Sequence, residues 1–255
     1  MASPEIIKLA EARVESFDHD ATAVHAVAPV VDAIRRLSSL NNNFKLLDVG
    51  GGNGSFLDTM LKALPESTGT LVEMSKGMAD KNETCDRKTI VCENFLEWAK
   101  ATEKCSARYD VIFFNFVLHH FVGNNRSQSI LLQKTAINAA QSILADGGLI
   151  VVYEIHYNGL FQDEIPSRLI HTLASSRILA PLTRRMGANT AGYGVCFHSE
   201  RYWRSLYSRH GLRIVDDHLI EKGVFTGIRS RLLQILLNIS SMTYKIHFLQ
   251  SVNSP

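Results

Sequence analysis

Residues 46–55 read Leu-Leu-Asp-Val-Gly-Gly-Gly-Asn-Gly-Ser, an apolar run that leads directly into a cluster of glycines. Glycine has no Cβ atom, so a loop built from it turns tightly and lets a ligand approach the main chain. We expect residues 45–49 to form a buried strand and a helix to begin at about Ser55, because the first N–H groups of a helix lack partners within it. The segment predicts an α/β sheet with a ligand-binding loop.

The spacing of the glycines separates two kinds of nucleotide-binding loop. The dinucleotide fingerprint GxGxxG, counted from Gly50 and Gly52, requires glycine at position 55, where this chain has Ser55. The next glycine is instead Gly54, which gives a GxGxG pattern. This spacing disfavours an NAD-dependent oxidoreductase, which we keep as an alternative.

Apolar runs alternate with helical patterns along much of the chain. Such alternation indicates a parallel sheet with right-handed crossovers, and near-continuous apolar strands indicate that helices cover both faces. The further strands are expected at residues 70–73, 88–92, 110–116, 149–155, 212–219 and 242–249, and the main helices at 127–144 and 199–210. A last amphipathic helix carries Ile228, Leu232, Ile235, Leu236 and Ile239 on one side.

Two segments lie outside this alternation. We expect residues 1–43 to form an N-terminal helical cover, in which residues 17–20 (Phe-Asp-His-Asp) either fold over the ligand or cap a surface helix. Residues 156–197 form an insertion with apolar patches and flexible glycines. Long insertions in compact domains are usually functional lids or disordered linkers, and the apolar patches favour a lid that covers the substrate.

Several motifs between residues 44 and 155 together resemble the class I S-adenosylmethionine-dependent methyltransferases. Besides the glycine loop, they are Glu73 at the end of the second strand, Val-Cys-Glu-Asn-Phe at 91–95, Val-Leu-His-His at 117–120, and the turn and strand at 144–154. The resemblance implies a doubly wound, mostly parallel seven-stranded Rossmann-like sheet whose last strand is antiparallel. Residues 44–255 then form the methyltransferase domain.

The resemblance also implies how S-adenosylmethionine is bound. A carboxylate such as Glu73 can accept hydrogen bonds from both ribose hydroxyls. Asn94 stands where the family usually has an aspartate that meets the adenine amino group, and Glu93 stays an alternative for that role. The implied cofactor-binding residues are Asp48, Gly50, Gly52, Gly54, Glu73, Met74, Asn94, Phe95 and Asn115.

Methyl transfer needs a general base only where the acceptor must lose a proton. The candidates beyond the carboxyl ends of strands four and five are His119, His120, Glu154 and His156. Histidine can accept a proton near neutral pH, but the histidine pair can equally serve shape and helix capping, and Glu154 can serve only to anchor a loop. His198 and Tyr193 are further residues that could face the acceptor.

The composition of the chain limits which acceptors, membranes and metal ions the protein is expected to bind. The formal net charge of +2 disfavours nucleic acid as acceptor, and no apolar run is long enough for a membrane span. No signal peptide is evident, and the four cysteines lack CxxC spacing, so we expect a cytoplasmic protein without a metal site. We predict O-, N- or C-methylation of a small organic metabolite. A cofactor-binding protein of the same fold without methyltransferase activity is the other alternative, and the sequence does not specify the oligomeric state.

Overall fold

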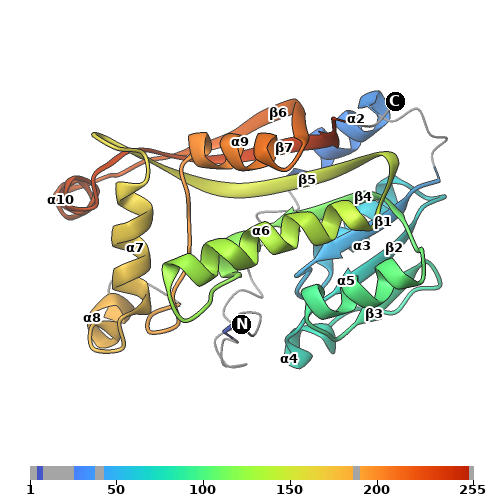
Figure 1. The fold of residues 1–255 in the computed structure, drawn as a ribbon, viewed down its shortest axis with the longest axis horizontal. Helices are drawn as coiled ribbons and strands as arrows, with labels where there is room; N and C mark the ends of the chain where they lie inside the picture. The colour runs from blue at the N-terminus through green and yellow to red at the C-terminus, as the bar shows by residue number, and fades with distance from the viewer. Residues whose placement is uncertain (1–4, 8–25, 38–42, 186–189, 253–255) are drawn as a thin grey trace.

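The computed structural model describes residues 5–7, 26–37, 43–185 and 190–252. Its strands form one seven-stranded sheet in the order β3-β2-β1-β4-β5-β7-β6, with helices on both faces (Figure 1). The strands are β1 Lys45–Val49, β2 Thr68–Val72, β3 Lys88–Val91, β4 Tyr109–Asn115, β5 Leu144–Gly159, β6 Leu212–Gly223 and β7 Ile239–Ser251. The helices are α2 Val27–Leu37, α3 Ser55–Ala63, α4 Lys76–Ala79, α5 Phe95–Lys104, η3 Leu118–His120, α6 Arg126–Ser142, α7 Ile165–Ser175, α8 Ala180–Arg185, α9 Glu200–Arg209 and α10 Ile228–Leu236.

The directions of the strands confirm the predicted fold class. Strands β1 to β5 pair in parallel, whereas β7 runs antiparallel to both β5 and β6. Side chains alternate between the faces of a strand, so Leu47 and Val49 pack in the core on the side of α5, α6 and α9. Leu46 packs in the opposite core, against α2 and α3.

The order of the strands places the ligand-binding crevice. Strand β1 lies between β2 and β4. After β1 the chain extends the sheet on one side, through β2 to β3, and then crosses over and extends it on the other side, through β4 to β5. Ligands of open α/β sheets bind beyond the carboxyl ends of the strands at such a switch point. The glycine loop begins there, where the Gly50 N–H donates to the Val72 carbonyl at 2.8 Å.

The prediction that the fifth strand ends at residue 155 is wrong. Strand β5 continues to Gly159 because the antiparallel β7 pairs with it over the whole distance, for example His156 with Thr243. The first four residues of the expected 156–197 insertion therefore belong to the sheet. The rest of the insertion contains the helices α7 and α8.

The N-terminal region is described only in part. Helix α2 buries Val30, Ala33 and Ile34 in the core, and the Ile7 N–H donates to the Val122 carbonyl at 2.8 Å. Residues 17–20, which we expect to cover a ligand or cap a helix, lie outside the described residues. Among the described helices, none combines the length and apolar character needed to cross a membrane.

Candidate active site

The glycine loop has backbone conformations that suit glycine. Gly50, Gly52 and Gly54 have φ angles of 67°, 57° and 81°, in the left-handed region that other residues rarely adopt. A Cβ atom added to Gly52 would meet only the Met78 methyl group, at 3.4 Å, so this side of the loop is open. Asn82 anchors the loop by donating to the Gly52 carbonyl at 2.9 Å.

Glu73, directly after β2, joins two loops of the site. Its Oε2 accepts the Gly52 N–H at 3.1 Å, and its Oε1 accepts the Ser75 N–H at 2.7 Å. The residue is buried. The carboxylate therefore lies against the glycine loop at the end of β2, and its contact with the ribose stays a prediction.

Asp48, on β1 two residues before Gly50, carries an unsatisfied oxygen. The Asn115 side chain donates to Oδ1 at 3.4 Å, while the buried Oδ2 has no hydrogen-bond partner among the described residues. Burial raises the pKa of the Asp48 carboxyl from 3.8 to about 7; the Asn115 hydrogen bond opposes this shift and the nearby Glu73 adds to it. A buried acceptor without a partner is costly, which fits a ligand that donates to it.

Three residues expected at the cofactor, of which Asn94 and Phe95 are expected at the adenine, lie in or beside the core of the protein. Asn94 caps α5, where its side-chain oxygen accepts the Leu96 N–H at 2.8 Å. Phe95 is buried in the core with its ring edge-on to Phe114, at a centroid distance of 5.7 Å. Met74 follows Glu73 and is half-buried. Contacts of these three residues with adenine or ribose stay predictions.

The structure brings two of the four catalytic candidates together. The turn η3 places the ring atom Nδ1 of His119 2.8 Å from Oε2 of Glu154 on β5. The backbone N–H of His119 donates to Oε1 of the same carboxylate at 3.3 Å. Glu154 is 1% exposed. The Phe197 ring stacks on the His119 ring at a centroid distance of 4.3 Å. Glu154 and Phe197 together fix the orientation of the His119 imidazole.

The other two candidates make no such pair. The His120 ring lies 4.1 Å from that of His119, and burial, with the neighbouring His119, holds the pKa of His120 well below its ordinary value. His156 is fully buried beside His247, and neither of its ring nitrogens has a hydrogen-bond partner among the described residues. Burial, followed by His247, lowers the pKa of His156 to about 3.

Glu164, just before α7, is a residue that the sequence analysis missed. It accepts hydrogen bonds from Arg126 at 2.6 Å, from His198 Nδ1 at 2.8 Å, and from the N–H and hydroxyl of Ser199. Gln133 lies 2.9 Å from the other ring nitrogen of His198. His198 is therefore buried in this network instead of facing an acceptor. No local motif marks Glu164, because its partners are distant in sequence.

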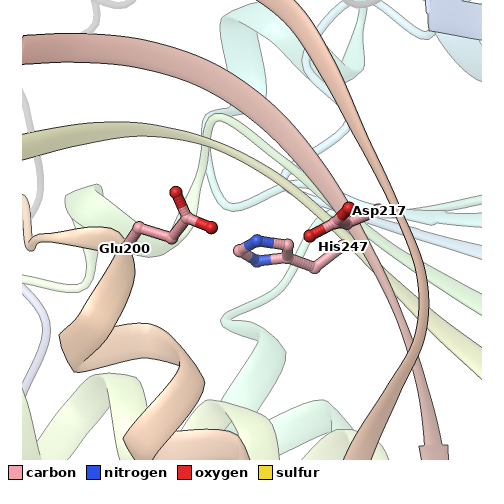
Figure 2. Close-up of side chains that lie close together, drawn as sticks. All are labelled: Glu200, Asp217 and His247. Atoms are coloured by element: carbon pink, nitrogen blue, oxygen red, sulfur yellow. The ribbon is translucent and has the colours of Figure 1, made fainter.

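A second charged cluster joins α9 to the antiparallel strands. Figure 2 shows His247 between Glu200 and Asp217, and the potential ligand atoms of these three residues lie within 4.8 Å of one another. Arg204 forms ion pairs with both carboxylates, and Lys245 lies 2.9 Å from Glu200. Because these two cations already neutralise the carboxylates, the cluster is better suited to anchoring α9 than to binding a metal ion.

A family model described as a methyltransferase domain matches residues 18–217. No curated protein sequence matches the chain significantly.

Similar solved structures support the fold. One is the MccD protein, with a TM-score of 0.58 and 10% sequence identity over 88% of this chain and 96% of that chain. Another is an S-adenosylmethionine-dependent methyltransferase from Geobacter sulfurreducens in complex with S-adenosylhomocysteine, with a TM-score of 0.52 and 13% identity over 89% of this chain and 90% of that chain. A third is an O-methyltransferase family protein from Burkholderia thailandensis, with a TM-score of 0.53 and 17% identity over 99% of this chain and 65% of that chain. The chain spans only 57% of another similar structure, that of CalO1, a methyltransferase in calicheamicin biosynthesis.

Proposed function

The chain belongs to the methyltransferase-domain family, and we propose that this S-adenosylmethionine-dependent methyltransferase acts on a hydroxyl group of a small organic acceptor. The observation that carries the choice of a hydroxyl is the buried pair of His119 and Glu154, 2.8 Å apart. A hydroxyl must lose its proton during methylation, whereas a neutral amine has an electron pair ready for attack. A positioned base is therefore most useful to a hydroxyl acceptor.

The crevice has features that fit the cofactor. The open side of Gly52 admits a ligand to the main chain, and Glu73 offers a carboxylate at the end of β2. The buried Oδ2 of Asp48 has no hydrogen-bond donor within the part of the chain that the structure describes. We assign binding to these residues together with Gly50, Gly54, Met74, Asn94, Phe95 and Asn115. When bound, S-adenosylmethionine supplies an activated methyl group on a sulfonium, so the protein has mainly to orient the reactants and exclude water.

His119 is the proposed base. An ionised Glu154 can only accept hydrogen bonds, so His119 Nδ1 carries the proton and Nε2 is left as the acceptor. When the acceptor oxygen attacks the methyl carbon, the bond from that carbon to the sulfonium sulfur would break and its electron pair would leave with S-adenosylhomocysteine. The proton of the acceptor hydroxyl would pass to Nε2 of His119, and Glu154 would stabilise the positive charge on the ring. His120 and His156 suit this step less well, because rings whose pKa is held low accept protons poorly.

We also propose that the helices of the insertion, α7 and α8, cover the acceptor. Two contacts support this role. Glu164 ties the start of α7 to α6 and to the start of α9, and Phe197, near the other end of the insertion, stacks on His119. A cover that closes over the base would exclude water from the methyl group.

The test is a comparison of His119→Asn and Glu154→Gln with the wild type, using labelled S-adenosylmethionine and panels of hydroxyl and amine acceptors. We expect His119→Asn to lower kcat by about 10²–10⁴-fold, the usual contribution of a general base, with unchanged affinity for S-adenosylhomocysteine. Glu154→Gln should lower kcat less. Wild-type kcat in His119→Asn, or methylation of amines alone, would refute the proposal.

A further inference from the structure

Helix α10 presents its apolar side to solvent. Ile228, Leu232, Ile235 and Leu236 are 80%, 55%, 65% and 74% exposed. Successive residues of an α-helix are about 100° apart around the axis, so these four share one stripe. The half-buried residues on the other side include the polar Ser230 and Gln234. The half-buried side holds Leu233 and Leu237 besides these two polar residues, whereas the stripe in solvent is wholly apolar. An ordinary surface helix instead buries its most apolar side.

The exposed stripe belongs to a larger apolar tip. The turn after β5 lies beside the end of α10, where the N–H groups of Leu160 and Phe161 donate to the carbonyl and the side chain of Asn238. Leu160 is 53% exposed and Phe161 is 86% exposed. Figure 1 shows α10 at one extremity of the molecule, far from the strands β1 to β3. Exposed apolar patches of this kind mark interaction sites.

The charges around the stripe indicate its partner. Residues 224–238 contain two arginines, at positions 229 and 231, and no acidic residue. Helical geometry places these two positions on opposite borders of the stripe. An apolar stripe bordered by arginines is the pattern of helices that lie in a membrane interface, where the cationic side chains meet anionic headgroups.

We propose that the tip formed by α10 and the turn at Leu160–Phe161 docks on an anionic phospholipid surface, with the stripe in the interface and Arg231 among the headgroups. The docking is peripheral and needs no helix that spans the bilayer. It is independent of the chemistry at His119.

The experiment is vesicle flotation of the full chain, with phosphatidylcholine vesicles with and without phosphatidylglycerol. We expect binding to the vesicles that contain phosphatidylglycerol and weaker binding at high salt. The double variant Ile235→Ser/Leu236→Ser should weaken partitioning by about tenfold or more, because it removes two apolar side chains from the interface. Arg231→Gln should weaken it about fivefold, and only on the anionic vesicles.

The matched control is Leu131→Ser, on α6, where the wild-type leucine is 49% exposed. This variant should float like the wild type, and unchanged S-adenosylhomocysteine affinity would show that each variant is folded. Absence of binding to the anionic vesicles, or equal binding by the double variant, would overturn the proposal. So would a dimer, measured by light scattering, that the double variant dissociates while no vesicle binding occurs.

Discussion

Asp48 couples the folding stability of the protein to pH. Its carboxyl is 1% exposed, and burial raises its pKa from 3.8 to about 7. Between these values the folded protein keeps a proton that the unfolded chain has released. Stability therefore falls as pH rises from about 4 to 7 and stays low above it. Holding a poorly solvated carboxylate at neutral pH costs stability, as functional sites often do.

We predict that Asp48→Asn is more stable than the wild type at pH 8 and equal to it near pH 4. One pKa unit corresponds to about 1.4 kcal/mol, so the gain is at most on the order of 4 kcal/mol. Thermal unfolding of both proteins across this pH range measures it. A difference that does not change with pH would mean that Asp48 is already ionised in the folded protein.

Glu73→Ala should weaken the binding of S-adenosylhomocysteine at least about tenfold, because hydrogen bonds to a charged group contribute about 1.5–3 kcal/mol. The variant also releases the Gly52 and Ser75 N–H groups that Glu73 now accepts. Calorimetry measures the affinity, and Glu83→Ala, at an exposed position, is the control. Equal affinity in the two variants would remove Glu73 from the cofactor site.

At the scale of elements, local patterns predicted most of the sheet. The range 45–49 expected for the first strand is the range of β1, and the other strands differ mainly at their ends. Strand β5 runs four residues further than predicted because its extension depends on pairing with β7, distant in sequence. The pairing of His119 with Glu154, 35 residues apart, likewise could not be read from spacing. The periodicity of α10 indicates an apolar stripe but not that the stripe faces solvent.

Glu164 is the residue on which the attachment of α7 depends. We expect Glu164→Ala to lower stability by roughly 2–3 kcal/mol, since it leaves Arg126 and His198 without their charged acceptor. It should also raise KM for the acceptor while affinity for S-adenosylhomocysteine stays unchanged. Denaturant unfolding and steady-state kinetics measure the two effects.

The neighbouring Asp163→Ala is the control for Glu164→Ala. The carboxylate of Asp163 lies 3.8 Å from the guanidinium of the exposed Arg201. Exposed ion pairs of this kind contribute little to folding stability. An unchanged acceptor KM in a destabilised Glu164→Ala would show that α7 does not cover the acceptor.

The whole molecule divides into two halves with different tasks. The parallel half, β1 to β4, carries the glycine loop, Asp48 and Glu73, whereas the antiparallel extension of β5, β7 and β6 carries the charged cluster and α10. His156 and His247 lie in the second half, both fully buried. Their burial makes this half sensitive to acid, because a buried neutral histidine opposes protonation in the folded state.

His247 should be a main source of that acid sensitivity. Burial, followed by the charge of Arg204, lowers its pKa from 6.5 to about 3. Above pH 6.5 both the folded and the unfolded states hold the ring neutral. Below it the unfolded chain gains a proton that the folded protein cannot accept until about pH 3, so stability is lost as pH falls. At pH 4 the loss is on the order of 3 kcal/mol.

We therefore predict that His247→Leu loses less stability than the wild type between pH 7 and pH 4. Asp48 acts with the opposite sign in the same window, so the informative quantity is the difference between variant and wild type at each pH, measured by thermal unfolding. A constant difference between His247→Leu and the wild type would mean that the cluster of Glu200, Asp217 and Arg204 tolerates a protonated His247, and acid sensitivity would then have to arise at His156.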